Sequence, residues 1–353
     1  MAAKLLSRYP WASSPFIVSA PMRVMSGPAL ATAVSQAGGL GFIGPGAKTQ
    51  DIGVDLEEAS ALIQKTRGSS GAFSALPSAS PLLPVGVGFQ LWGDDINIAT
   101  TTIEKYKPCA AWLFAPGEGQ KDLDEWSRRL RQASPQTQIW IQIGTLREAR
   151  ELLHSPEKPD VIVVQGAESG GHGRTTDGLG LITLFPEVAD AMASSQIPLL
   201  AAGGIVDGRG VVASLGLGAA GAVMGTRFLA ANEARISRGY QNEILRAEDG
   251  AVNTTRTLLY NHLRGTYGWP AGYSPRTIIN KSFEEHQAGT SFEDLKKRHD
   301  EAAKTGDKGW GPEGRLATYA GASVGLIHDL KKTEDIVRDV QKDALRQIHS
   351  LTS

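Results

Sequence analysis

Apolar residues in this chain fall into short continuous runs, and most runs are followed by a segment with the length and polarity of a surface helix. Strands that are buried on both faces, as in a parallel sheet, carry such runs without strict alternation of apolar and polar residues. The strands predicted on this basis are 16–21, 40–43, 82–89, 111–115, 138–143, 161–165, 198–202 and 222–228. The helices predicted between them are 27–37, 54–65, 95–106, 122–133, 146–154, 184–193 and 209–217, with another that starts near residue 232.

Eight alternating strand and helix units favour an α/β fold of the (β/α)8 TIM-barrel type over an open doubly wound sheet. The barrel is expected to span residues 12–230. Charged, aromatic and turn residues are mixed over 231–315, which predicts an additional, mainly helical C-terminal subdomain or lid. The last part, 316–353, is expected to pack back on the barrel as a glycine-rich loop and an amphipathic helix over 333–348. The apolar face of that helix comprises Ile336, Val340, Leu345 and Ile348.

The composition narrows the functional classes. The 353 residues include 36 Lys and Arg against 37 Asp and Glu, so the net charge of −1 lacks the basic footprint of a nucleic-acid-binding protein. Cys109 is the single cysteine, which excludes a disulfide or a cysteine zinc site within the chain and favours a reducing compartment. No apolar run approaches the ~18 residues of a membrane span, and the N-terminal residues lack a signal-peptide core. We therefore expect a cytoplasmic protein that is not associated with a membrane.

Glycines gather where the predicted strands end. In a (β/α)8 barrel, function is located at the C-terminal ends of the strands, and a phosphate group is often bound by the loops after the last two of them. Gly203 and Gly204 follow the seventh strand, and Gly225 and Thr226 belong to the eighth. Glycine lets backbone N–H groups approach phosphate oxygens because no Cβ intervenes. A tight turn explains a single glycine better, but paired glycines at neighbouring strand ends favour a phosphate site.

His172 is the histidine that its strand places at the same rim, within the glycine-rich stretch 163–174. An imidazole can take or give a proton near neutral pH with little tuning, so His172 is the candidate catalytic residue. The alternative is a loop histidine with a structural hydrogen bond. The remaining histidines fall on predicted helices or in the C-terminal region and are expected to be structural or exposed: His154, His262, His286, His299, His328 and His349.

Other motifs carry less weight. The stretch 39–44 fits G-x-G-x-x-G, but it follows a predicted helix and contains a strand, which is the reverse of a dinucleotide-binding turn. The stretch 321–325 fits G-x-S-x-G without the preceding strand of a hydrolase nucleophile elbow. Cys109 is expected to be a buried small residue. An isomerase or aldolase that uses a lysine is disfavoured, because the sequence places no lysine at the end of a predicted strand. The spacing of histidines and carboxylates does not predict a metal site. The lysines considered were Lys48, Lys105 and Lys281.

Several stretches together resemble the nitronate monooxygenase family, formerly called 2-nitropropane dioxygenase. They are APM at 20–22, AGGLGFIG at 37–44, VQGAESGGHG at 164–173 and AAGGIVDGRGVVASLGLGAAGAVMGTRFL at 201–229, with a weaker echo in YAGASVGLI at 319–327. The resemblance covers about residues 12–230. It implies a barrel that binds FMN and oxidises alkyl nitronates, or nitroalkanes after deprotonation, with O2 to carbonyl compounds and nitrite.

The resemblance also implies a role for individual residues. His172 would abstract the α-proton or bind the nitronate oxygens, and a cationic ring would suit an anionic substrate. The flavin ring would lie beside the segment 21–23 and Gly88, and the remaining cofactor-binding residues would contact the ribityl chain and phosphate. The full set of expected cofactor-binding residues is Pro21, Met22, Arg23, Gly88, Gln165, Gly170, Gly171, Gly203, Gly204, Met224, Gly225 and Thr226.

The expected partners are a small-molecule substrate and O2, and a homodimer is compatible with such a chain. Three alternatives stay open. The segment from about 233 to 315 matches nothing in the family pattern, so the enzyme could act on a larger natural product. The same scaffold also carries FMN-dependent NAD(P)H oxidoreductases of the quinone or enoyl-thioester reductase type. A flavin- or phosphate-binding barrel without catalytic activity is the third.

Overall fold

Eight parallel strands form one sheet in the order β1-β9-β8-β6-β5-β4-β3-β2 in the computed structural model, which describes residues 2–66, 72–76 and 81–352. The strands are β1 (Ile17–Ser19), β2 (Phe42–Ile43), β3 (Leu83–Gln90), β4 (Pro108–Phe114), β5 (Gln138–Ile143), β6 (Val161–Gln165), β8 (Leu199–Ala202) and β9 (Ala222–Met224). A parallel bridge between Val18 and Leu40 joins the two ends of the sheet, so the strands close into a barrel. The predicted (β/α)8 fold is confirmed.

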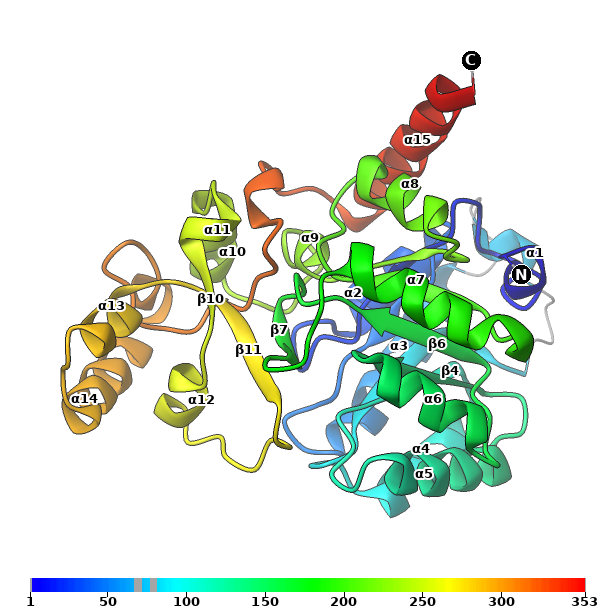
Figure 1. The fold of residues 1–353 in the computed structure, drawn as a ribbon, viewed down its shortest axis with the longest axis horizontal. Coiled ribbons are helices and arrows are strands. Elements are labelled where there is room, and N and C mark those ends of the chain that lie inside the picture. The colour runs from blue at the N-terminus through cyan, green and yellow to red at the C-terminus, as the bar shows by residue number, and fades with distance from the viewer. Residues whose placement is uncertain (1, 67–71, 77–80, 353) are drawn as a thin grey trace.

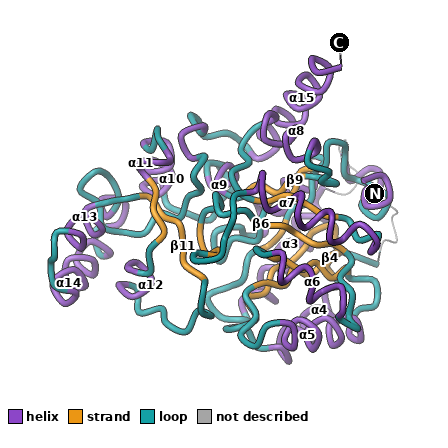
Figure 2. Tube along the Cα trace, viewed as in Figure 1, coloured by secondary structure: helices purple, strands orange, loops and turns teal. Residues whose placement is uncertain are grey.

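Helices cover the outside of this barrel, which occupies the right half of the molecule (Figures 1 and 2). They are α2 (Pro28–Gln36), α3 (Asp51–Thr66), α4 (Ile96–Tyr106), α5 (Gln120–Ala133), α6 (Leu146–His154), α7 (Leu181–Met192), α8 (Gly208–Gly216) and the short α9 (Thr226–Leu229). A further helix, α1 (Ala2–Leu6), precedes β1. Asp95 and Asp207 cap α4 and α8 by accepting backbone N–H bonds, which satisfies donors that a helix start leaves free.

Aromatic rings fill part of the barrel interior. Phe42 contacts Trp112 and Trp140 with ring centroids 5.1 and 5.0 Å apart, and all three side chains are fully buried. A Cβ at Gly86 would lie 2.2 Å from the Phe42 ring, so this glycine makes room for the ring. The barrel interior around these rings is therefore a packed core. The cavity lined by residues of the strand ends opens towards the C-terminal ends of the strands.

Two boundaries of the last unit were wrong. The strand predicted over 222–228 ends at Met224, and Thr226–Leu229 is helical, because Gly225 leaves the extended conformation with φ −109° and ψ −74°. The helix expected to start near residue 232 is α10 (Arg238–Arg246), and it starts after Ser237, whose hydroxyl accepts the N–H of Tyr240. The capping residue Ser237 therefore marks the first residue of α10 more accurately than the pattern of apolar residues does.

A second sheet of three antiparallel strands lies beside the barrel mouth, in the order β10-β11-β7. It joins β7 (Gly171–Arg174) to β10 (Thr254–Arg256) and β11 (Tyr273–Ile278), which the sequence did not predict. The rest of this region is helical and extends to the left in Figure 1. Its helices are α11 (Gly250–Asn253), α12 (Leu259–Leu263), α13 (Lys281–Gln287) and α14 (Phe292–Ala303), the last capped by Ser291.

The C-terminal helix α15 (Thr333–Thr352) packs on α8 and α2 and projects beyond the barrel at its end (Figure 1). Ile336 and Val340 are buried in this contact as predicted. Leu345 is 53% exposed, so its assignment to the apolar face was wrong, and Ala344 is buried against Gly208 instead. None of the helices in the described ranges combines the length and apolar character needed to cross a bilayer.

Candidate active site

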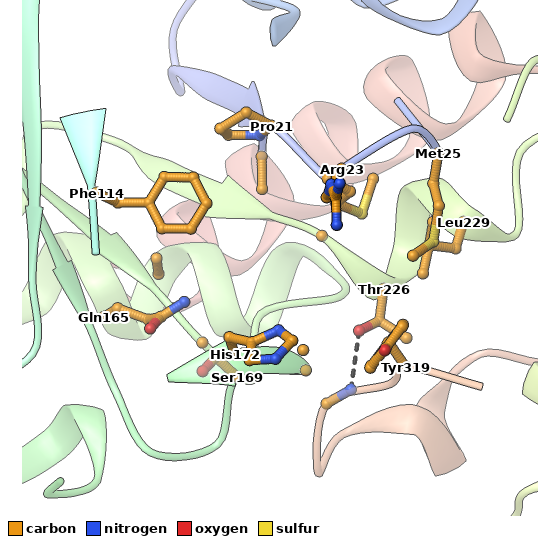
Figure 3. A pocket seen from close by; sticks show the side chains of 18 of the residues that line it. Pro21, Arg23, Met25, Phe114, Gln165, Ser169, His172, Thr226, Leu229 and Tyr319 are labelled. Carbon is orange, nitrogen blue, oxygen red and sulfur yellow. Dashed lines mark hydrogen bonds between the residues drawn. The ribbon is translucent and has the colours of Figure 1, made fainter. Parts of the chain in front are cut away.

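A cavity of about 400 Å³ opens at the C-terminal ends of the barrel strands, between the barrel and the second sheet. Figure 3 shows Pro21, Arg23 and Met25 on one side of it and His172 on the other. The size is that of a small-molecule or cofactor site. Most residues expected to form the site line this cavity: Pro21, Met22, Arg23, Gln165, Gly170, Gly171, His172, Gly203, Gly204, Gly225 and Thr226.

Gly88 and Met224 are not among the residues that line the cavity. A Cβ at Gly88 would lie 2.4 Å from the Pro21 ring, so Gly88 supports the cavity wall from behind. Met224 is fully buried in β9, and its carbonyl accepts the N–H of Ala20. Both residues therefore act on the cavity through the segment that follows β1.

Gly203 and Gly204 turn the chain sharply after β8, with φ values of +108° and +71° that side chains rarely allow. A Cβ at Gly204 would lie 3.2 Å from both the Cβ of Glu168 and the Oγ of Ser323. These glycines, with Gly225 after β9, present bare backbone to one end of the cavity. This arrangement matches the position at which (β/α)8 barrels bind phosphate.

The C-terminal loop closes the same end of the cavity. The hydroxyl oxygen of Thr226 accepts the N–H of Gly321 at 2.9 Å, drawn as the dashed line in Figure 3. A Cβ at Gly170 would lie 2.5 Å from the nitrogen of Gly321, so the two backbones touch. The stretch 321–325 therefore serves as a close-packed wall, and Ser323 brings a hydroxyl to the cavity that the sequence did not single out.

The segment after β1 forms the opposite wall. The N–H of Met22 donates to the Ser26 hydroxyl at 2.8 Å, and Val24 has a positive φ of 55°. The Arg23 guanidinium donates to the carbonyl oxygens of Gly46 at 3.1 Å and Ala47 at 2.9 Å. The side chain of Arg23 is thus held by the loop after β2, which fixes the backbone that faces the cavity.

His172 lies on β7, opposite Pro275 of β11. Its ring stacks on Trp269 with centroids 3.5 Å apart and an interplanar angle of 3°. The Nε2 atom is 2.8 Å from Nδ2 of Asn261, and the Tyr319 ring lies 6.0 Å away. A ring held on one face and at one nitrogen is presented to the cavity in a single orientation.

The surroundings of His172 keep its ring neutral. Burial lowers its pKa to about 3, and the positive charges of Arg256, Arg264 and Arg23 act in the same direction, while the Asn261 hydrogen bond opposes them. Without an anionic partner, the ring is therefore neutral rather than cationic. A neutral imidazole has a lone pair and can act as a base without first losing a proton.

The low pKa of His172 predicts a pH dependence of stability. The unfolded chain takes up a proton on this histidine below about pH 6.5, whereas the folded chain does not until the pH approaches about 3. The free energy of unfolding should therefore fall as the pH decreases through this range. Between pH 7 and pH 5, wild type should lose about 2 kcal/mol more than His172→Asn in urea unfolding. Equal losses would show that His172 is readily protonated in the folded protein.

Arg256 fastens the loop that carries His172. Its guanidinium donates to the carbonyl oxygens of Ala167 at 3.1 Å, Ser169 at 3.0 Å and Gly171 at 3.1 Å. Burial, and the charge of Arg276 beside it, lower the pKa of Arg256 to about 10, so it stays a cation at neutral pH. The strand β10 thereby fixes the stretch between β6 and β7 from outside the barrel.

The residues set aside in the sequence lie away from this chemistry. Cys109 is buried in β4, and burial raises the pKa of its thiol. The stretch 39–44 connects α2 to β2, as its place in the chain predicted. Lys48, Lys105 and Lys281 are not among the residues that line the cavity. In the described part of the chain, no three His, Cys, Asp or Glu residues are grouped as metal ligands.

The family model for nitronate monooxygenases matches residues 11–67 and 127–341. The chain belongs to the nitronate monooxygenase family. The nitronate monooxygenase npaC of Metarhizium robertsii is 57% identical over 340 residues, which cover 96% of this chain and 94% of npaC. The nitronate monooxygenase of Neurospora crassa is 33% identical over 364 residues, which cover 99% of this chain and 94% of that protein.

The solved structure of a nitroalkane oxidase from Streptomyces ansochromogenes matches with a TM-score of 0.72 and 23% identity, over 96% of this chain and 98% of that one. This likeness supports the barrel fold. As a member of the nitronate monooxygenase family, the chain is an oxidoreductase of a flavin-dependent family. The family match includes His172 and the segment that carries Asn261 and Trp269, whereas Gly88 lies outside it.

Proposed function

We propose that this protein oxidises alkyl nitronates, and nitroalkanes after deprotonation, with O2 to carbonyl compounds and nitrite, and that FMN is its cofactor. The observation that carries the proposal is the position of His172, stacked on Trp269 at the wall of a cavity that is also lined by Gly203, Gly204 and Gly225, the glycine cradle. Burial lowers the pKa of this histidine, which favours a neutral ring. Membership of the nitronate monooxygenase family supports the same reaction. FMN, when bound, would supply the electron-accepting chemistry.

The residues present fit FMN. A phosphate needs close approach of the backbone. The Gly203–Gly204 turn has positive φ angles, and a Cβ at Gly204 would make tight contacts of 3.2 Å with Glu168 and Ser323. Thr226 and Ser323 add hydroxyl groups at the same end. We assign the phosphate to this cradle, the ribityl chain to the side of Gln165, and the flavin ring to the wall formed by 21–25.

His172 would perform the acid–base step. A neutral nitroalkane loses its α-proton to the lone pair of a ring nitrogen, the C–H bond breaks, and its electron pair remains on the substrate as the nitronate. The stacked Trp269 ring covers one face of the imidazole and fixes its plane for this transfer. The protonated ring is then paired with the anionic nitronate, whose negative charge offsets the burial and the arginine charges that otherwise disfavour a cationic His172.

We propose three structural units for this function: the FMN-binding barrel over 12–230, a lid over 231–315, and a closing segment over 316–353. The lid supplies Asn261, Thr266 and Trp269 to the cavity. Its position on the substrate side makes it the part that decides which nitronate enters. The proposal extends to a cytoplasmic location, which a single free, buried cysteine favours.

The test is a spectrum of the purified protein under anaerobic conditions. We expect bound FMN, loss of its visible absorbance when ethylnitronate is added without NAD(P)H, and release of nitrite when oxygen is admitted. If only NADH or NADPH removes the absorbance, the protein is instead a reductase of the quinone or enoyl-thioester type. If neither ethylnitronate nor NAD(P)H reduces the flavin, a binding role without catalysis follows. A colourless protein that takes up no FMN would contradict the proposal.

A further inference from the structure

Asn261 makes a contact with His172 that its place in the sequence did not predict. The side chain is 2% exposed, and its Nδ2 atom lies 2.8 Å from Nε2 of His172. The other amide atom, Oδ1, is buried and has no hydrogen-bond partner within the described residues. The contact with His172 is therefore the one hydrogen bond recorded for the Asn261 side chain among the described residues, and either end of the amide can make it.

Asn261 cannot move away from the ring, because its backbone is fixed. It lies on α12, where its carbonyl accepts the N–H groups of Arg264 at 3.1 Å and Thr266 at 2.8 Å. Its neighbours Tyr260 and Leu263 are fully buried. Stacking on Trp269 fixes the imidazole in the same way. The remaining freedom is a half-turn of the Asn261 amide, which exchanges Nδ2 and Oδ1.

The two amide orientations correspond to two proton positions on His172. When Nδ2 donates to Nε2, the ring proton is on Nδ1, and the ring can only donate a hydrogen bond to the cavity. When Oδ1 accepts from Nε2–H, the lone pair is on Nδ1, and the ring can act as a base. Nδ1 has no partner within the described residues, so a half-turn breaks one hydrogen bond and forms one.

We propose that Asn261 is a positioning residue whose amide orientation decides which nitrogen of the neutral His172 ring carries the proton. With Oδ1 accepting from Nε2–H, Nδ1 is the base, and this hydrogen bond is kept when Nδ1 takes up the α-proton, because the protonated ring still donates from Nε2. The proposal rests on the proposed function for its catalytic meaning, but the tautomer control exists independently of any substrate. A neutral partner suits this role because it can both donate and accept.

The charges around the ring support a neutral partner. The groups that act on His172 are Arg256 of β10, Arg264 after α12 and Arg23 after β1, and all three are cations. The phenol of Tyr319 is held by Arg264 at 2.7 Å. A carboxylate at position 261 would pair with a protonated ring and remove the base. An amide leaves the ring neutral while still fixing its orientation.

The first test is nitrogen NMR of the holoenzyme labelled with ¹⁵N-histidine, with His172→Asn used to assign the signals. In wild type, the two ring nitrogens should report a neutral ring from pH 9 to pH 5. Asn261→Asp should raise the pKa of His172 by about 1 to 3 units, since the new carboxylate favours the charged ring. Asn261→Leu should average the two nitrogen shifts, because nothing then selects a tautomer. Asn97→Asp, on the outer helix α4, is the control for added charge and should change neither.

The second test compares a neutral nitroalkane with its preformed nitronate, since only the former needs a base. Asn261→Leu should lower kcat/KM for nitroethane about 10- to 100-fold more than for ethylnitronate, with FMN content unchanged. An equal loss on both substrates would make Asn261 merely structural and would overturn the proposal. Unchanged ring-nitrogen signals in both Asn261→Asp and Asn261→Leu would overturn it as well. If wild type turns over neither substrate, the proposed function fails, while the NMR result still decides the role of Asn261.

Discussion

His172→Asn is expected to lower kcat/KM for a neutral nitroalkane by about 10²- to 10⁴-fold while the protein keeps its FMN. The wild-type ring is neutral at working pH values because burial and three nearby arginines lower its pKa to about 3, so it does not have to lose a proton before it can act as a base. Asparagine fills a similar space and can hydrogen-bond to Asn261, but it cannot accept the α-proton. Oxygen uptake and nitrite release with nitroethane between pH 6 and pH 9 measure the effect.

The matched control for this variant is His262→Asn. His262 lies on the same α12 as Asn261 but stacks on Tyr267, and it is not among the residues that line the cavity. It should leave the turnover of nitroethane unchanged. With preformed ethylnitronate, His172→Asn should lose much less, because the proton has already left the carbon. Unchanged turnover of nitroethane by His172→Asn would remove this histidine from the mechanism.

The barrel could be predicted because its strands are buried on both faces. Every residue of β4 is buried, and such a strand reads as an unbroken apolar run wherever it occurs. The end of β9 could not be predicted in the same way. The stretch after Met224 mixes Gly225, Thr226 and Arg227 with apolar residues and can continue a strand or begin a helix, so the change at Gly225 depends on backbone angles that the composition does not encode.

The second sheet shows a different limit. The strand β7 contains two glycines, Gly171 and Gly173, among its four residues and follows Gly170, so its sequence resembles a loop, since glycine weakens a strand. It becomes a strand only because β11, about 100 residues later, pairs with it through Ser274 opposite Gly173 and Pro275 opposite His172. The pattern of residues around β7 does not reveal this pairing with β11. The sequence therefore predicted that His172 lies at the rim, but it did not predict the strand that supports it.

The same limit explains which site residues were found. The glycines and His172 follow barrel strands, so the fold alone brings them to one rim. Asn261 and Trp269 reach the cavity from a segment that does not follow a barrel strand. In the sequence, neither residue differs from ordinary helix or loop residues. One part of the site is therefore positioned by the barrel strands, and the other part, which holds the His172 ring in place, comes from the segment that contains α12 and β11.

Gly204→Val should give a folded protein that binds FMN about 100-fold more weakly than wild type. Gly204 has a φ of +71°, which costs a branched residue about 1 to 2 kcal/mol, and its Cβ would lie 3.2 Å from Glu168 and Ser323. The turn would then widen and move its backbone N–H groups away from the phosphate, and each hydrogen bond to a charged group contributes about 1.5 to 3 kcal/mol.

The control for Gly204→Val is Gly216→Ala, at the end of α8, where nothing lies within 4 Å of an added Cβ. It should bind FMN as wild type does and be slightly more stable, since alanine favours a helix. Flavin content after purification and titration of the apoprotein with FMN measure both variants, and far-UV circular dichroism checks that they fold.

Riboflavin, which lacks the phosphate, distinguishes a loss of phosphate binding from a general loss of flavin binding. If the cradle holds the phosphate, Gly204→Val should weaken FMN binding and leave the much weaker binding of riboflavin unchanged. Equal losses for both ligands would place the phosphate elsewhere.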